Sequence, residues 1–152
     1  MISIIIPNLH SPLIDQVIAA LAVQTAHASI REVIVVGQDR YRRIPADVRF
    51  IPTPQPISPA AARNLGARLA GGDYLLFLDA DCIAAPDLVE QILKCHRQGH
   101  AVVGGAVAPE AGSYWRLCDN LLVFAAFLTS ASSGARPYLT SVAISIARDV
   151  FA

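Results

Sequence analysis

Hydrophobic residues along the chain form short continuous runs that alternate with longer amphipathic stretches. The runs are rich in β-branched residues and end near Pro, Gly or Asp, a pattern typical of strands buried on both faces of a sheet. They predict strands over residues 2–6, 32–37, 48–51, 73–78, 101–107 and 139–146. The amphipathic stretches, with apolar residues three or four positions apart, predict helices over residues 12–22, 59–70, 86–98 and 113–130, and another beginning at 148. Ser11 is expected to cap the first of these helices, and Gly71-Gly72 to end the second.

This alternation defines the fold class that we expect. Strands joined by helical crossovers give an α/β fold, a mostly parallel sheet with helices on both faces. The 152 residues suffice for one domain. Ligands of such sheets bind in the crevice beyond the carboxyl ends of the strands, so the chemistry is expected in residues that directly follow a strand.

Composition and charge narrow the class of protein. Hydrophobic residues make up 54% of the chain and charged residues 16%, against about 45–50% and about 25% in typical globular domains, which excludes an intrinsically disordered chain. The 12 Lys and Arg balance the 12 Asp and Glu. The chain therefore lacks the basic excess of a general nucleic-acid binder, and no nucleic-acid partner is expected.

The high apolar content raises the question of a membrane. The longest apolar run, Leu121–Leu128, falls well short of the about 18 residues that a spanning helix requires. The three cysteines have neither CxxC nor zinc-site spacing and fit reduced thiols in a cytoplasmic protein. The apolar helix around Trp115–Leu128 is interpreted as core packing, with two alternatives: a homodimer contact or a peripheral contact with a membrane.

A pair of aspartates follows the strand expected at residues 73–78. Asp79 and Asp81, two positions apart in an extended segment, would point to the same side. Two carboxylates this close repel each other unless positive charge lies between them. A hard divalent cation, Mg²⁺ or Mn²⁺, held together with substrate phosphates, would relieve that repulsion. The pair therefore predicts a metal site for a diphosphate ligand; the alternative is a solvated turn or a helix cap.

Three further residues are candidates for ligand binding. Arg63 lies early in the helix expected from Pro59, where free backbone N–H groups and a planar guanidinium suit phosphate; the alternative is a surface charge. Asn8 and Asp39 follow neighbouring strands and could hydrogen-bond a base or a ribose, although each also suits a turn. Gly66 is expected to allow a close contact between helix and sheet.

Other chemistries find little support. The chain contains no GxSxG, HExxH, GxGxxG or phosphate-loop motif. His96 and His100 stand one helical turn apart, but Gly99 breaks that helix, so both are interpreted as solvated. Neither histidine is therefore expected to be a ligand.

Together these pieces resemble the inverting glycosyltransferases of family 2, which have the GT-A fold. The resemblance begins at Ile2–Asn8 (ISIIIPN), is most specific over Ser58–Cys82 (SPAAARNLGARLAGGDYLLFLDADC) and continues to Leu139–Phe151 (LTSVAISIARDVF). It covers nearly the whole chain. It implies a single Rossmann-like domain over residues 1–152 that binds a nucleotide-diphospho-sugar donor.

The resemblance also implies roles for individual residues. Pro7 and Asn8 would line the nucleotide pocket, and Arg63 would lie beside the base or the diphosphate. Asp79 and Asp81 would form the DxD motif, with Asp81 the direct ligand of Mn²⁺ or Mg²⁺ and Asp79 nearer the ribose. The metal would neutralise the leaving nucleoside diphosphate while the hydroxyl of an acceptor, a glycan, a lipid or a protein, attacks the anomeric carbon with inversion.

Two departures from the family pattern limit what is implied. Gly37 and Gln38 stand where the family usually has an acidic pair that meets uracil, and Asp39 follows one or two positions later. The family segment that supplies the catalytic base would follow residue 152, so we expect a donor-binding part, truncated at its C-terminal side. Two alternatives stay open: a nucleotidyl or sugar-phosphate transferase, and a non-catalytic nucleotide-binding or assembly module that kept the fold.

Overall fold

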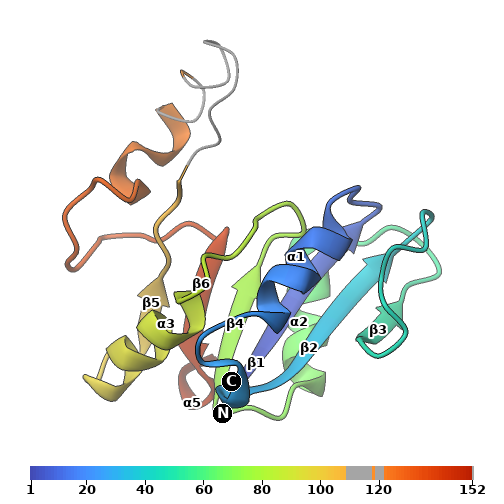
Figure 1. Ribbon diagram of the computed structural model, residues 1–152, viewed down its shortest axis with the longest axis horizontal. Coiled ribbons are helices and arrows are strands. Elements are labelled where there is room, and N and C mark those ends of the chain that lie inside the picture. Colours follow the sequence, from blue (N-terminus) through green and yellow to red (C-terminus); the bar gives the residue numbers. More distant parts are fainter. Residues whose placement is uncertain (109–117, 119–121, 152) are drawn as a thin grey trace.

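A six-stranded sheet organises the computed structural model, which describes residues 1–108, 118 and 122–151 (Figure 1). The strands lie in the order β3-β2-β1-β4-β6-β5. Their bounds are β1 (Ile2–Leu9), β2 (Ile30–Gln38), β3 (Arg49–Pro52), β4 (Tyr74–Leu78), β5 (Val102–Gly104) and β6 (Ala143–Ala147). Five strands share one direction, and β6 opposes them because it pairs antiparallel with both β4 and β5.

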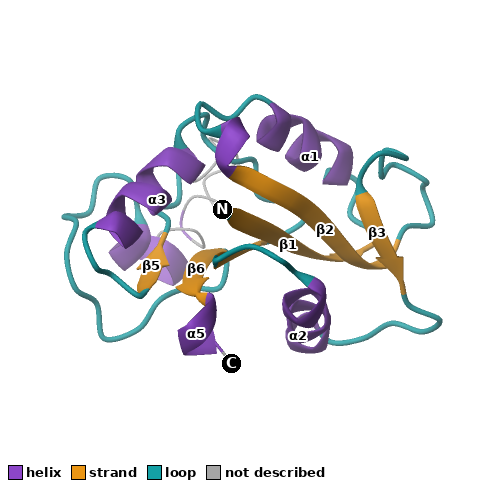
Figure 2. Ribbon diagram, turned by 90° about the horizontal axis from the view of Figure 1, so that it is seen from below, coloured by secondary structure: helices purple, strands orange, loops and turns teal. Residues whose placement is uncertain are grey.

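Helices cover both faces of this sheet. They are α1 (Ile14–Ala22), α2 (Pro59–Leu69), α3 (Leu88–Arg97) and α5 (Arg148–Phe151), with 3₁₀ turns at His27–Ser29 and Ala125–Phe127. Figure 2 shows α1 and α3 on one face and α2 and α5 on the other. Two buried clusters match this division, one beneath α1 and α3 and the other beneath α2 and α5. The expected α/β fold, a mostly parallel sheet between helices, is confirmed.

The central strand β1 separates the two clusters. Its residues 2–6 are fully buried, and successive side chains point to opposite faces. Ile4 therefore packs in the cluster beneath α1 and α3, whereas Ile5 packs in the cluster beneath α2. Gly66 of α2 lies so close to Ile5 that a Cβ atom at Gly66 would be 2.4 Å from the Cγ2 atom of Ile5. The predicted close helix–sheet contact is thus confirmed.

Several element boundaries differ from the sequence prediction, including those of β1, α1 and β6. β1 continues through Pro7 because its pairing with β4 ends at Ile5 opposite Phe77, so a residue without an N–H group is tolerated there. α1 begins at Ile14 rather than at Pro12 and has no side-chain cap. β6 begins at Ala143 instead of residue 139, which leaves residues 139–142 as a loop.

The apolar helix expected over residues 113–130 is described only in part. Residues 109–117 and 119–121, and with them Trp115, lie outside the described residues. Within the described part, the 3₁₀ turn at Ala125–Phe127 is followed by a bridge between Leu128 and Val107, so the helix does not continue to residue 130. The homodimer and membrane contacts suggested for Trp115–Leu128 stay predictions. None of the helices described here is long and apolar enough to cross a membrane.

The expectation that His96 is solvated is wrong. The side chain of His96 is only 6% exposed, because it lies on the face of α3 that packs against the sheet. Its Nε2 atom lies 2.8 Å from the Oγ atom of Ser145, and its Nδ1 atom lies 2.7 Å from the carbonyl oxygen of His100. The imidazole stacks on Tyr74, and burial lowers the pKa of His96.

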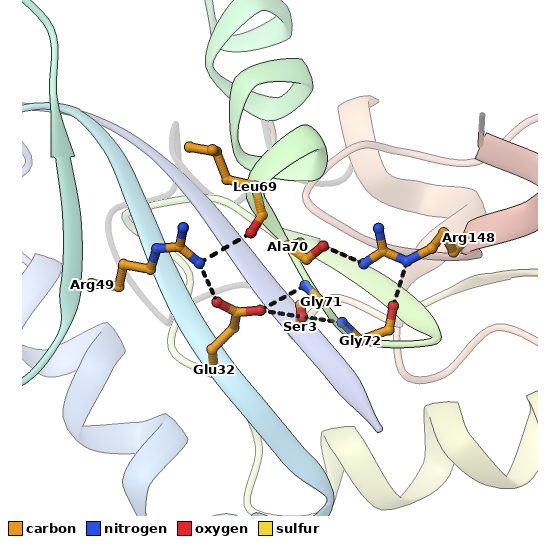
Figure 3. A network of polar contacts seen from close by, with 8 residues as sticks. All are labelled: Ser3, Glu32, Arg49, Leu69, Ala70, Gly71, Gly72 and Arg148. Carbon is orange, nitrogen blue, oxygen red and sulfur yellow. Dashed lines mark hydrogen bonds and ion pairs between the residues drawn. The ribbon is translucent and has the colours of Figure 1, made fainter.

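Polar contacts centred on Glu32 close the end of the sheet where the parallel strands begin (Figure 3). The Oε1 atom of Glu32 accepts hydrogen bonds from the Oγ atom of Ser3 at 3.1 Å and from the backbone N–H of Gly71 at 2.7 Å. Its Oε2 atom accepts one from Arg49 at 2.7 Å. Burial by itself would raise the pKa of Glu32, but these hydrogen bonds lower it.

The same network fixes the segment between α2 and β4. The guanidinium of Arg148 donates to the carbonyl oxygens of Ala70 at 2.6 Å and Gly72 at 2.7 Å (Figure 3). The N–H of Gly72 donates to Ser3 Oγ at 2.9 Å. The predicted end of α2 at Gly71-Gly72 is confirmed, and side chains from β1, β2 and α5 hold it.

Candidate functional site

A pocket lies beyond the carboxyl ends of the parallel strands, where a ligand of such a sheet is expected. Its volume is about 760 Å³, within the roughly 300–1,000 Å³ of small-molecule pockets. The ends of β1, β2 and β4 and the start of α2 form its walls. Of the residues predicted to bind a ligand, the lining contains Pro7, Asn8, Arg63, Asp79 and Asp81.

Asp79 and Asp81 occupy a tight turn directly after β4. The N–H of Cys82 donates to the carbonyl oxygen of Asp79 at 3.1 Å, so the segment is not extended as the sequence predicted. The change of direction after β4 still leaves both aspartates in the pocket lining. The two carboxylates differ in exposure, because Asp81 is exposed and Asp79 is half-buried.

Arg63 reaches from α2 to the first of these carboxylates. The predicted start of α2 is confirmed, since the Oγ atom of Ser58 accepts from the N–H of Ala61 at 3.2 Å. The Nη2 atom of Arg63 donates to Oδ1 of Asp79 at 2.5 Å. The Nε atom of Arg63 is buried and has no hydrogen-bond partner. Arg63 is therefore an ion-pair partner of Asp79 and still has an unused donor.

The charge of Asp79 is only partly compensated by this ion pair. Burial raises the pKa of Asp79, and the neighbouring charge of Asp81 adds to that effect, while Arg63 acts in the opposite direction. The net result is a raised pKa. A cation bound beside Asp79 would act in the same direction as Arg63 and favour the charged carboxylate.

The residues of the turn fit a divalent cation that takes its remaining ligands from phosphate oxygens. No group of three or more His, Cys, Asp or Glu side chains that could hold a metal converges within the described part of the chain. A cation at Asp79 and Asp81 would therefore take its remaining ligands from a diphosphate and water, which is usual for Mg²⁺. Since Arg63 already occupies one oxygen of Asp79, Asp81 is the more accessible ligand.

Asn8 lines the pocket, but its side-chain amide is hydrogen-bonded to other groups of the protein. The residue is 3% exposed. Its Nδ2 atom donates to the carbonyl oxygen of Gln38 at 2.8 Å, and its Oδ1 atom accepts from the N–H of Ser11 at 3.1 Å. Asn8 thus joins the segment that follows β1 to the end of β2. Pro7, in β1 beside it, offers the pocket an apolar wall.

Asp39 is not part of the lining of this pocket. It borders a smaller hollow of about 410 Å³, formed with residues of the 42–50 segment. Its Oδ2 atom accepts from the N–H of Ile44 at 2.9 Å, and its buried Oδ1 atom has no hydrogen-bond partner. The sequence prediction grouped Asp39 with Asn8 because both follow neighbouring strands, but the chain turns away after Gln38.

The backbone at Gly37 favours glycine over any residue that has a side chain. Its φ of +134° disfavours any residue with a side chain. In addition, a Cβ atom there would lie 2.0 Å from the carbonyl oxygen of Asn8. A carboxylate at this position is incompatible with the observed contact between β1 and β2.

Sequence reasoning missed several residues of the pocket lining, among them the hydroxyl side chains of Ser11, Thr53 and Ser141. Ser11 was interpreted as a helix cap, yet its hydroxyl donates to the carbonyl oxygen of Ala80 at 2.6 Å. Thr53 follows β3 and has a buried Oγ1 atom without a partner. Ser141 comes from the loop before β6. Only the position of Thr53 directly after a strand could have revealed it from sequence.

Comparison with known proteins places this α/β domain in a family. The model of "Glycosyl transferase family 2" matches residues 3–117, and the chain belongs to that family. A protein of Haemophilus influenzae, described as an uncharacterized glycosyltransferase, is 48% identical over 54 residues, which are 36% of this chain and 21% of the relative.

Solved structures of glycosyltransferases share the fold. A mannosyltransferase from Pyrobaculum calidifontis, in complex with GDP-Man and Mn²⁺, has a TM-score of 0.68 and 18% identity over 99% of this chain and 45% of its own. Glucosyl-3-phosphoglycerate synthase from Mycobacterium tuberculosis, in complex with Mn²⁺, UDP and phosphoglyceric acid, has a TM-score of 0.63 and 17% identity. That match covers 98% of this chain and 56% of the synthase. The structure of S. aureus TarS residues 1–349 has a TM-score of 0.63 and 19% identity, and the match covers 74% of this chain and 37% of that structure. This chain therefore spans between about a fifth and just over half of these proteins.

Proposed function

We propose that the pocket binds a nucleotide-diphospho-sugar, the donor of a sugar-transfer reaction, together with Mn²⁺ or Mg²⁺. The observation that carries the proposal is the pair Asp79 and Asp81 at the carboxyl end of β4, in a pocket of about 760 Å³ that also contains Arg63. Membership of glycosyl transferase family 2 supports it. So do the neighbours that bind GDP-Man or UDP with Mn²⁺.

In this proposal the residues of the chain hold and orient the donor. Asp79 and Asp81 supply carboxylate ligands for the cation, and Arg63 keeps Asp79 in place. The bound cation supplies positive charge that stabilises the leaving nucleoside diphosphate. Arg63 also lines the pocket, where its positive charge would lie beside the nucleotide.

The transfer itself is a displacement at the anomeric carbon. The acceptor oxygen forms a bond to that carbon while the bond from the carbon to the diphosphate oxygen breaks, so the electron pair leaves with the diphosphate and the configuration inverts. The acceptor proton passes to a base, for which we assign no residue of this chain. A glycan, lipid or protein acceptor and a cytoplasmic location belong to the same proposal.

Calorimetric titration of UDP and of GDP, each with and without Mn²⁺, tests the proposal directly. We expect Mn²⁺ to tighten the binding of one nucleotide at least about tenfold, a typical coupling between two ligands. Asp81→Ala should remove this enhancement because it removes the accessible carboxylate. Asp47→Ala is the matched control, since Asp47 is an exposed aspartate outside the pocket lining.

Two outcomes would contradict the donor site. If neither nucleotide binds under any condition, the pocket does not take a nucleoside diphosphate, and the alternative of an assembly module gains support. If a nucleotide binds equally well with and without Mn²⁺, and Asp81→Ala changes nothing, the aspartates hold no metal for the ligand.

A further inference from the structure

A chain of hydrogen bonds crosses the carboxyl ends of β2, β1 and β4. The carbonyl oxygen of Gln38, the last residue of β2, accepts from Nδ2 of Asn8 in β1 at 2.8 Å. The Oδ1 atom of Asn8 accepts from the N–H of Ser11 at 3.1 Å. The Oγ atom of Ser11 then donates to the carbonyl oxygen of Ala80, after β4, at 2.6 Å. We call this set the Asn8–Ser11 bridge.

The local backbone fixes the direction of the Ser11 hydroxyl. His10 has a positive φ of 58° and turns the chain directly after β1. The Oγ atom of Ser11 accepts from the N–H of Leu13 at 3.2 Å, so its own hydrogen is free to point at Ala80. Both polar ends of the neighbouring Asn8 amide are also occupied. Each member of the bridge therefore has one defined orientation.

The bridge ends at the residue between the two candidate metal ligands. Ala80 stands between Asp79 and Asp81 in the turn after β4, and Ser11 is the side chain that holds its carbonyl group. The other end of the bridge is Gln38, in the wall of the same pocket. A ligand that spans the pocket would touch both ends at once, so their separation determines how well one molecule satisfies both.

We propose that Ser11, held by Asn8, is a positioning residue that sets the place of the Asp79–Asp81 turn relative to the rest of the nucleotide pocket. This rests on the proposed function, because it assumes that a nucleotide and a cation share the pocket. Asn8 acts in it through its amide rather than by touching the ligand. Small displacements of such groups have large effects on ligands held at two points.

The opposite end of β1 provides a matched control. Ser3 also uses its hydroxyl twice, donating to Oε1 of Glu32 at 3.1 Å and accepting from the N–H of Gly72 at 2.9 Å. Ser3→Ala therefore removes the same atom and a similar pair of hydrogen bonds at the other end of β1. Ser3 is fully buried at the end of the sheet away from the pocket, so its loss should affect stability alone.

The experiment measures the affinity of UDP and GDP, with and without Mn²⁺, for the wild-type chain, Ser11→Ala and Ser3→Ala. The informative quantity is the ratio of the two affinities, the metal enhancement. We expect Ser11→Ala to lower this ratio at least about fivefold and to change the metal-free affinity less than about twofold. Ser3→Ala should leave both affinities unchanged and lower the melting temperature. Ser11→Thr, which keeps a hydroxyl, should retain the enhancement.

Three results would overturn the positioning role. The first is a Ser11→Ala variant with the full metal enhancement. The second is an equal loss of affinity with and without Mn²⁺, which would mean that the pocket has loosened as a whole. The third is a wild-type chain whose nucleotide affinity does not respond to Mn²⁺; that result rejects the proposed function itself, and the positioning role with it.

Discussion

A carboxylate and an arginine meet at each end of the sheet, but the two groups are built differently. Where the strands begin, Glu32 accepts hydrogen bonds from Ser3, Arg49 and the backbone, and its pKa is lowered. Where the strands end, burial raises the pKa of Asp79 although Arg63 lies beside it. The contacts of the fold therefore stabilise the charged form of Glu32 but not that of Asp79.

The unpaired atoms follow the same division. Within the described ranges, three buried side-chain atoms have no hydrogen-bond partner: Asp39 Oδ1, Thr53 Oγ1 and Arg63 Nε. All three belong to residues at the carboxyl end of the sheet. A buried polar atom without a partner costs about 1–3 kcal/mol. We infer that the polar groups where the strands begin satisfy one another, whereas those where the strands end are less completely satisfied by the fold.

The largest effect on stability is expected from Glu32→Ala. This change removes the acceptor of three hydrogen bonds and leaves the N–H of Gly71 without its partner. We expect the free energy of unfolding to fall by about 2–3 kcal/mol, measured by chemical denaturation. Nucleotide affinity should change less than about twofold. A Glu32→Ala variant that has normal stability but has lost Mn²⁺-dependent nucleotide binding would contradict the proposed difference between the two ends of the sheet.

Arg63→Met should have a smaller effect on stability and a clear effect on binding. It leaves the half-buried carboxylate of Asp79 next to Asp81 without its cation, which we expect to cost about 1–2 kcal/mol at neutral pH. Because protonation of Asp79 removes that penalty, the difference from wild type should shrink as the pH falls. Denaturation at several pH values measures this. Arg68→Met, an exposed arginine of the same helix, is the control; equal losses in both variants would argue against the ion pair.

The smallest expected effect is on the pH dependence of stability, to which the two carboxylates should contribute with opposite signs. The folded-state pKa of Glu32 lies below its ordinary 4.5. Its stabilising contribution is therefore complete above that value and is lost as the pH falls through the folded pKa. The folded-state pKa of Asp79 lies above its ordinary 3.8. Its contribution is present at lower pH and is lost as the pH rises through the folded pKa.

Stability curves against pH for Glu32→Gln and Asp79→Asn measure these two contributions. Glu32→Gln should lose less stability than wild type on acidification. Asp79→Asn should be at least as stable as wild type at neutral pH, because it removes a carboxylate whose burial is incompletely compensated. The same slope in both variants would show that the ends of the sheet do not differ electrostatically.

The sequence predicted most of the fold because its strands are continuous apolar runs and its helices keep a regular apolar spacing. It also identified Asp79 and Asp81, since their place after a buried strand is visible without a structure. The direction of β6 was not predictable, because an apolar run does not encode whether its neighbours are parallel. The same holds for His96, whose burial depends on how α3 lies on the sheet.

The polar contacts of the site were harder to predict than its position. Asn8 and Ser11 stand where a ligand residue and a helix cap are expected, and only the folded chain reveals that they bond to segments far away in the sequence. Asp39 follows its strand as expected but lies in another hollow. Proximity to a strand end thus predicts the region of a site, whereas side-chain partners depend on the loops that connect the strands.

The most direct test of the account compares Asp79→Asn with Glu32→Gln in two measurements on the same samples, thermal unfolding and Mn²⁺-dependent nucleotide binding. We predict a crossed result: Asp79→Asn keeps its melting temperature and loses the metal enhancement, while Glu32→Gln melts at a lower temperature and keeps the enhancement. A melting temperature that falls in Asp79→Asn while nucleotide binding is retained would contradict the assignment of the carboxyl end to a ligand.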